Sequence, residues 1–216
     1  MTQVDVGRAV LEANQRLASQ LRRRFRAAKV KVMNLISSPG AGKTSLLEQT
    51  FARLRGKIKA GVIEGDVQSQ LDAERIKACG VNAVQIETMG ACHLDGAMVE
   101  RALMGLNLDE LELVVIENVG NLVCPVEFDL GEDIKVGLLS VAEGDDKPLK
   151  YPQLFRRAGV VVINKTDLLG HVDFDLEKAM DACRRLNPHA RIFTLSCRSG
   201  EGLDEWCRWV EEWVKG

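Results

Sequence analysis

Ser37-Ser38-Pro39-Gly40-Ala41-Gly42-Lys43-Thr44 is the stretch that decides the fold of this chain. It follows a short apolar run, Val30 to Ile36, and precedes Ser45-Leu46-Leu47, which opens a helical pattern. Strand, glycine-rich turn and helix in this order form the context in which G-x-x-x-x-G-K-[ST] binds nucleotide phosphates. The first position is Ser37 in place of Gly, and Ser also hydrogen-bonds locally in turns. An ordinary turn with two glycines is the alternative, but motif and context together favour a phosphate-binding loop.

Each residue type in this loop suits the binding of phosphate. Backbone N–H groups close around phosphate oxygens, and the N-terminus of the following helix favours negative charge. We expect Lys43 to reach the β- and γ-phosphates as a catalytic residue, and Thr44 to ligate Mg²⁺. The nucleotide-binding residues expected in this stretch are Pro39, Gly40, Ala41, Gly42, Lys43, Thr44 and Ser45.

The composition is that of a globular protein with a sizeable core. The chain has 216 residues, of which 46% are hydrophobic and 28% charged. A net charge of −2 gives no general attraction to nucleic acid or membrane. No apolar run approaches the roughly 18 residues of a membrane span, and the N-terminus lacks a signal-peptide core. We therefore expect a cytoplasmic protein that binds neither nucleic acid nor membrane.

The six cysteines contain no C-x-x-C pair. In a cytoplasmic protein they are expected to be free thiols or metal ligands, and a framework of three disulfides is the weaker alternative.

Apolar runs alternate with helical patterns along the chain. Strands are expected at about 30–36, 60–63, 82–86, 113–117, 135–141, 160–163 and 191–195, and helices at about 43–55, 71–79, 94–104, 153–158, 176–186 and 203–214. This alternation predicts an α/β protein of the P-loop NTPase class, with a mostly parallel sheet of about seven strands and helices on both faces. Ligands should bind at the carboxyl ends of the strands.

Residues 1–28 have apolar positions at spacings of three and four, which indicates an amphipathic helix. The basic run Arg22-Arg23-Arg24-Phe25-Arg26 suits a solvated helix end. A membrane or nucleic-acid patch is the alternative, and the rest of the chain offers it no support. We expect an N-terminal helix over 1–28, packed on or appended to a P-loop domain over 29–216.

Asn164-Lys165-Thr166-Asp167 directly follows the apolar run 160–163. The Asp167 carboxylate can accept two hydrogen bonds from the N1–H and 2-amino groups of guanine. Adenine lacks these donors, so ATP would leave the buried carboxylate unpaired. Asn164 can brace the loop, and the stem of Lys165 can cover the base. A plain polar turn is the alternative.

This element resembles the N-K-x-D motif of P-loop GTPases, which implies GTP and GDP as ligands. Ser196 and Cys197, in Ser-Cys-Arg-Ser-Gly after the next expected strand, resemble the GTPase loop whose backbone N–H groups cover the guanine carbonyl.

Acidic residues near strand ends are candidates for holding Mg²⁺ and water during phosphoryl transfer. We expect Asp66 and Glu117 to join Thr44 around the magnesium ion, directly or through water. Glu117-Asn118-Val119-Gly120 takes the place of the D-x-x-G of signalling GTPases. Asp72 is the candidate catalytic residue for orienting the attacking water, with a solvated carboxylate as the alternative.

Cys92, His93 and Cys124 carry soft or borderline ligand atoms that suit Zn²⁺ and Ni²⁺. They follow predicted strands, so they could converge at one end of the sheet. Their spacing matches no zinc-finger rule, and spacing alone favours buried free cysteines.

Five segments in this order resemble the hydrogenase nickel-incorporation GTPases, the HypB family of the SIMIBI class, over nearly the whole chain. They are Ser38 to Thr44, Glu64-Gly65-Asp66, Gly90-Ala91-Cys92-His93-Leu94, Glu117 to Pro125, and Asn164 to Asp167. The resemblance implies that Cys92, His93 and Cys124 bind Ni²⁺ and/or Zn²⁺ near the switches and a dimer interface. Urease nickel GTPases share the design but carry a contiguous Cys-Pro-His motif, which is absent here.

The resemblance also implies a homodimer favoured by GTP, with 145–152 resembling a segment implicated in dimer contacts. The implied partners are a small nickel-binding hydrogenase accessory protein and the precursor of the hydrogenase large subunit. Residues 1–28 contain neither Cys nor His, so neither the cysteine-rich nickel motif nor the histidine-rich stretch of some members is present there.

The sequence therefore favours a Mg²⁺-dependent GTPase that assists nickel insertion into a [NiFe]-hydrogenase precursor, with GTP-dependent dimerisation controlling metal binding or transfer. One alternative is a metal-binding adaptor whose nucleotide is structural. Another is a related GTPase that serves urease or a cobalamin enzyme.

Overall fold

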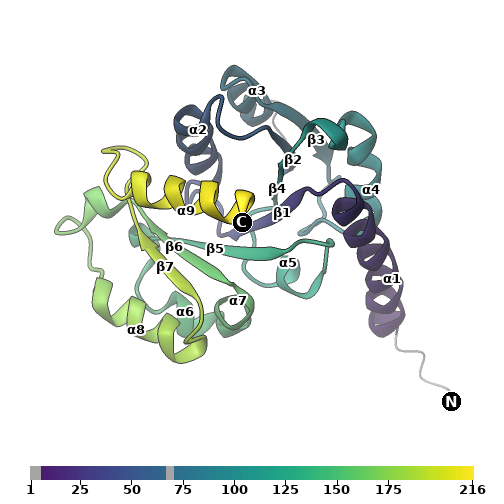
Figure 1. Ribbon diagram of the computed structural model, residues 1–216. Coiled ribbons are helices and arrows are strands. Elements are labelled where there is room, and N and C mark those ends of the chain that lie inside the picture. The colour runs from purple at the N-terminus through teal and green to yellow at the C-terminus, as the bar shows by residue number, and fades with distance from the viewer. Residues whose placement is uncertain (1–5, 67–70) are drawn as a thin grey trace, which may run out of the picture.

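A computed structural model describes residues 6–66 and 71–216, and for 6–8, 66 and 71–74 it describes the backbone only. Within these residues seven strands form one parallel sheet in the order β3-β2-β4-β1-β5-β6-β7 (Figure 1). The strands are β1 (Lys31–Ser37), β2 (Ala60–Asp66), β3 (Asn82–Glu87), β4 (Leu113–Glu117), β5 (Ile134–Ser140), β6 (Val160–Asn164) and β7 (Arg191–Thr194). The predicted parallel sheet is confirmed.

The strand that leads into the phosphate-binding loop lies at the centre of the sheet. β1 pairs with β4 on one side and β5 on the other, with Met33 opposite Val115 and Ile134 respectively. β4 and β6 are buried along their whole length. Such continuous apolar strands are expected where helices cover both faces of a parallel sheet.

One face of the sheet is covered by α2 (Lys43–Leu54), α3 (Leu71–Ala78) and α9 (Leu203–Lys215). Trp206 of α9 is 1% exposed and packs in the same core as Leu35 and Leu46. Its indole Nε1 donates a 2.8 Å hydrogen bond to Thr50 Oγ1 of α2, which ties the last helix to the helix of the phosphate-binding loop.

The other face is covered by α1 (Val6–Ala27), α4 (Gly96–Ala102), α7 (Pro152–Arg157) and α8 (Leu176–Leu186). Figure 1 shows α1 and α4 side by side at one end of the sheet, with α8 at the other end. Leu21 and Phe25 of α1 share a buried cluster with Leu94 and Val99. No helix within the described ranges has both the length and the apolar character that a bilayer crossing requires.

The helix predicted over 94–104 is shorter than expected. α4 begins at Gly96 because the Asp95 side chain accepts a hydrogen bond from Met98 N and caps it. It ends at Ala102, and the chain continues as the 3₁₀ turn η1 (Leu103–Gly105). Short elements that the periodicity did not indicate are α5 (Cys124–Glu127), α6 (Lys147–Lys150), η2 (Leu108–Glu110), η3 (Val141–Glu143) and η4 (Thr166–Leu168).

Candidate nucleotide and metal site

The phosphate-binding loop requires glycine for two reasons at Gly42. Its φ of 103° lies in the left-handed region, and a Cβ there would lie 2.5 Å from Asn164 Nδ2. Directly after it, α2 begins at Lys43, whose Nζ donates a 3.1 Å hydrogen bond to Ser37 Oγ. The serine that departs from the motif is therefore a contact of the motif lysine.

The loop forms one wall of a hollow of about 520 Å³ at the carboxyl ends of β1, β2 and β4. The described residues that line it are Pro39, Gly40, Gly42, Lys43, Thr44, Ser45, Glu64, Gly65, Arg75, Glu117, Asn118, Val119, Gly120 and Lys165. Within the loop, Ala41 is buried and its carbonyl accepts a 3.0 Å hydrogen bond from Asn164 Nδ2; its role in nucleotide binding stays a prediction. We call this hollow the phosphate cleft.

Buried oxygens gather where a magnesium ion would be needed. Thr44 Oγ1 donates a 2.9 Å hydrogen bond to Glu117 Oε1. Glu117 is 8% exposed and Glu64 is 1% exposed, so both residues are buried. Hydroxyl and carboxylate oxygens are the ligands that Mg²⁺ prefers, so this donor set fits the ion. Asp66 ends β2 and Asp72 lies in α3, but their side chains lie outside the described residues.

Two charged residues of the cleft were assigned no role from sequence. Glu64 had a signal, because a carboxylate inside the apolar strand Val62-Ile63-Glu64 needs a polar partner. Arg75 had none. It forms a 2.6 Å ion pair with Glu48 and a 3.4 Å hydrogen bond to Ser45 Oγ, which holds a guanidinium at the rim of the phosphate cleft.

Asn164 ties the phosphate-binding loop to the loops expected to hold the base. Besides its bond to Ala41, its Oδ1 accepts hydrogen bonds from Lys165 N at 2.7 Å and Cys197 N at 3.2 Å. The Lys165 side chain reaches Gly40, with Nζ donating to the carbonyl at 2.7 Å. The two motifs thus form one hydrogen-bonded unit although they lie far apart in sequence.

A second hollow, of about 320 Å³, lies beside this unit. It is lined by Gly42, Ser45, Glu48, Gln49, Asn164, Lys165, Asp167, Leu168, Cys197 and Arg198. The Asp167 carboxylate accepts a 2.5 Å hydrogen bond from Ser196 Oγ, and burial raises the pKa of the Cys197 thiol to about 11. The Asp167 carboxylate is thus part of the lining of this hollow, and the Ser196 hydroxyl orients it.

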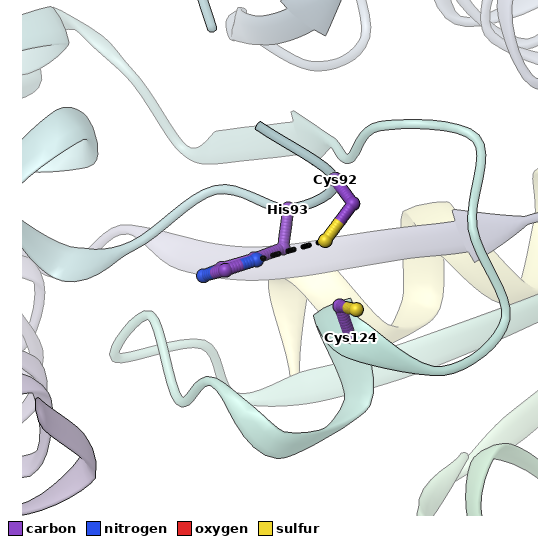
Figure 2. A group of neighbouring side chains, drawn as sticks. All are labelled: Cys92, His93 and Cys124. Carbon is purple, nitrogen blue, oxygen red and sulfur yellow. Dashed lines mark hydrogen bonds between the residues drawn. The ribbon is translucent and has the colours of Figure 1, made fainter. Parts of the chain in front are cut away.

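The predicted metal ligands converge. The ligand atoms of Cys92, His93 and Cys124 all lie within 4.8 Å of one another, and Cys92 Sγ lies 3.5 Å from His93 Nδ1. In Figure 2 Cys92 and His93 come from the loop before α4, and Cys124 opens α5 opposite them. Each of the six cysteines, all within the described part of the chain, is a free thiol.

The surroundings of this cluster act in opposite directions on its thiol and its imidazole. The hydrogen bond with Cys124, together with burial, raises the pKa of Cys92, which opposes the thiolate form that a metal binds. Burial lowers the pKa of His93, which favours the neutral imidazole that metals bind. The His93 ring stacks on Phe128, with centroids 3.8 Å apart. Two sulfurs and an imidazole form a donor set that suits Zn²⁺ or Ni²⁺.

Comparison with known proteins places this site in a family. A family model described as CobW/HypB/UreG, nucleotide-binding domain, matches residues 31–194. A hydrogenase maturation factor HypB of Azotobacter vinelandii is 54% identical over 204 residues, covering 94% of this chain and 67% of the relative. Another, from Escherichia coli strain K12, is 51% identical over 202 residues, covering 94% of this chain and 70% of the relative.

A solved structure described as HypB from Helicobacter pylori in complex with nickel superposes with a TM-score of 0.89. It is 38% identical to this chain, and the match covers 94% of this chain and 95% of that one. The chain therefore belongs to the CobW/HypB/UreG family and, within it, to the HypB hydrogenase maturation factors.

Proposed function

We propose that this chain is a Mg²⁺-dependent GTPase of the cytoplasm that controls the delivery of nickel to a [NiFe]-hydrogenase precursor. Its cargo would bind at Cys92, His93 and Cys124, and GTP would favour a homodimer. The partners we propose are a small nickel-binding accessory protein and the precursor of the hydrogenase large subunit. The names of the relatives and the nickel complex of the Helicobacter pylori protein support the cargo and the pathway.

GTP is the proposed nucleotide because of the base-side hollow. Asp167 would accept two hydrogen bonds from guanine. We keep Ser196 and Cys197 as the candidates to contact the guanine carbonyl; in the structure their backbone N–H groups donate to the Glu201 carbonyl and to Asn164 Oδ1. Lys43 would neutralise charge on the β- and γ-phosphates. A magnesium ion held by Thr44, Glu117 and Asp66 would supply further charge stabilisation there. We keep Asp72 as the candidate for orienting the attacking water.

The observation that carries the control of metal by nucleotide is the position of Asn118. This residue lines the phosphate cleft and is 1% exposed. Its Oδ1 accepts hydrogen bonds from Val119 N at 3.0 Å and from Leu94 N at 3.1 Å. Leu94 directly follows His93, and Asn118 directly follows Glu117. If the γ-phosphate displaced the loop that begins at Asn118, the hydrogen bond from Leu94 N would therefore shift or break, and with it the link to the segment that carries His93.

The other half of the Asn118 amide is held by the sheet. Its Nδ2 donates to Asn34 Oδ1 at 3.2 Å, and Asn34 Nδ2 donates to Glu132 Oε1 at 3.3 Å. All three side chains are buried. A buried amide with donors and acceptors engaged cannot turn away without leaving a polar group unsatisfied, so the link would transmit displacement rather than absorb it.

The dimer is proposed for the face that carries α6. The segment 145–152 includes Leu149, which is 60% exposed. Asp145 forms a 2.9 Å ion pair with Lys178, which anchors the segment to α8. An exposed leucine on an anchored segment suits contact with a second copy.

Hydrolysis is tested by measuring phosphate release from GTP with and without Mg²⁺. Turnover that requires Mg²⁺ is expected. Its absence would favour a metal-binding adaptor with a structural nucleotide.

Coupling is tested by titrating Ni²⁺ into the protein loaded with GDP or with a non-hydrolysable GTP analogue, with the oligomeric state followed in parallel. The two wild-type affinities are expected to differ, within the about 5- to 150-fold range typical of coupled sites. In Asn118→Ala the ratio should fall toward one while both nucleotides still bind. Equal affinities in the wild-type protein would remove the coupling from the proposal.

A further inference from the structure

We infer that Asn14 of the N-terminal helix is a positioning residue for the metal ligands, and that α1 sets the distance between the two segments that carry them. The inference rests on the proposed metal site at Cys92, His93 and Cys124. It gives a role to a helix that the sequence indicated as amphipathic and as packed on or appended to the P-loop domain.

The Asn14 side chain bridges the two ligand-bearing segments. Its Nδ2 donates a 2.8 Å hydrogen bond to the backbone carbonyl of Asp129, five residues after Cys124. Its Oδ1 accepts a 2.8 Å hydrogen bond from the backbone N–H of Gly96, three residues after His93. Asn14 is 5% exposed, so water offers little competition for either bond.

Both segments also approach the helix too closely for an ordinary side chain. A Cβ on Gly96 would lie 2.9 Å from Leu17 Cβ, and a Cβ on Gly131 would lie 2.8 Å from the backbone N of Arg22. Gly131 also has a φ of +80°. The helix backbone is thus packed directly against the start of α4 and against the loop that follows α5.

A charged pair fixes the second of these segments. Arg22 Nη2 donates to both carboxylate oxygens of Asp129, at 2.7 and 2.8 Å, and Asp129 Oδ1 also accepts from Gly131 N. Phe128, the neighbour of Asp129, stacks on the His93 ring. A shift of the loop 128–131 relative to α1 would therefore also move the Phe128 ring, on which His93 stacks.

The consequence is energetic. Ligands from two segments bind a metal more weakly when the segments must first be brought to the right distance. The free energy needed to order the segments then reduces the binding free energy. Loss of outer-shell partners that orient metal ligands typically weakens metal affinity by about 10- to 100-fold. Asn14 bonds the backbone of both segments, so Asn14→Ala is expected to fall in this range.

The test is a Ni²⁺ titration of wild type and Asn14→Ala, read from thiolate-to-nickel charge-transfer absorption, with GDP affinity and Tm measured alongside. Asn187→Ala is the matched control. Its Nδ2 bridges the carbonyls of Arg156 and Ala158, at 3.3 and 3.0 Å, and so joins α8 to the end of α7. It therefore removes the same kind of bridge from a part of the fold without ligands.

Asn14→Ala is expected to bind Ni²⁺ about 10- to 100-fold more weakly, with an altered charge-transfer spectrum and unchanged GDP affinity. Asn187→Ala should lower Tm but leave Ni²⁺ affinity and the spectrum unchanged. Wild-type Ni²⁺ affinity in folded Asn14→Ala, or equal weakening in the control, overturns the inference.

If Asn14→Ala fails to fold, Arg22→Gln provides the test because it alters only a partly exposed ion pair on the same loop. Weaker Ni²⁺ binding supports the inference, and wild-type affinity overturns it. A variant with both Cys92→Ser and Cys124→Ser distinguishes a failure of the proposed metal site from a failure of the inference about Asn14. If it retains wild-type Ni²⁺ binding, the proposed metal site fails and the inference with it. If it loses binding while the Asn14 and Arg22 variants do not, only the inference fails.

Discussion

The Ser196 hydroxyl donates a 2.5 Å hydrogen bond to the Asp167 carboxylate, although the two residues come from loops after different strands. The contact fixes the carboxylate that we assign to guanine before any base is bound. A carboxylate oriented in advance loses less conformational freedom on binding, so base recognition should depend on this pair as well as on Asp167 itself.

Asp167→Asn should exchange GTP for xanthosine triphosphate. The amide offers a donor where the carboxylate accepted, which mismatches the guanine 2-amino group and matches the xanthine 2-oxo group. A charged hydrogen bond contributes about 1.5–3 kcal/mol, so GTP affinity should fall at least about tenfold. Fluorescent-nucleotide titration measures both affinities. Ser196→Ala should show a smaller loss without the switch, and unchanged GTP affinity in Asp167→Asn would remove the base-reading role.

Replacing Cys92 and Cys124 together by Ser should abolish Ni²⁺ binding, since the hydroxyl is a poor ligand where the site offers thiolates. GDP affinity should stay at the wild-type value because neither cysteine lines the described nucleotide hollows. Titration followed by charge-transfer absorption measures the effect. Cys79→Ser is the matched control, as this half-buried thiol bonds the backbone of α2 and α3 away from the cluster.

Gly42→Ala should disable nucleotide binding. The new Cβ would collide with Asn164 Nδ2, and the left-handed φ adds about 1–3 kcal/mol of strain. Relief would break the bond between Asn164 and Ala41. Gly56→Ala is the control: its φ is +75°, but nothing lies within 4 Å of the added Cβ. It should lose stability without losing GDP affinity, and wild-type GDP affinity in Gly42→Ala would contradict the prediction.

The hydrogen bond between Trp206 and Thr50 can be removed from either side. Loss of the acceptor in Thr50→Val should cost more hydrogen-bond free energy than loss of the donor in Trp206→Phe. The valine leaves the buried indole N–H without an acceptor, which costs about 1–3 kcal/mol. The phenylalanine removes the donor, and Thr50 Oγ1 keeps its 2.6 Å bond to the Leu46 carbonyl. Urea unfolding of both single variants and the double variant gives the coupling energy. Simple additivity would show that the bond contributes nothing.

Asp129→Asn should make the free energy of unfolding less dependent on pH in the acidic range. Burial opposes the charged form, but the hydrogen bonds from Arg22 and Gly131 outweigh it and lower the pKa of Asp129 below its usual 3.8. A lowered pKa stabilises the fold at neutral pH, and that contribution is lost as pH falls through the folded-state pKa. The pair is partly exposed, so the difference should stay below about 1 kcal/mol at neutral pH and vanish in strong acid. Urea unfolding across pH measures it.

The two nucleotide motifs could be located from sequence because each is a contiguous run whose backbone geometry is set locally. The runs that hold Gly42 and Asp167 follow the apolar strands β1 and β6, and parallel strands have their carboxyl ends at the same edge of the sheet. Asp66 and Asp72 remain predictions. The α4 boundary was predicted wrongly although Asp95 carries an N-cap signal that sequence can show.

The candidate metal centre was only partly predictable. Spacing alone favoured buried free cysteines, and the assignment of Cys92, His93 and Cys124 depended on resemblance. Asn118 and Asn14 could not be assigned at all. Each is an ordinary polar residue in its own segment, and its importance lies in backbone partners brought near by the fold. Hydrogen bonds between distant segments leave no periodic trace in a single sequence.

The order of strands has a consequence for how such a protein can change. The loops with the candidate metal ligands follow β3 and β4, the loops with the candidate base ligands follow β6 and β7, and β1 lies between these two pairs of strands in the sheet. The candidate metal and base ligands therefore lie on opposite sides of β1, the strand that leads into the phosphate-binding loop. Substitutions on one side of β1 can therefore change the candidate metal ligands while the candidate base ligands on the other side stay the same. A change of bound metal would then not require a change of nucleotide.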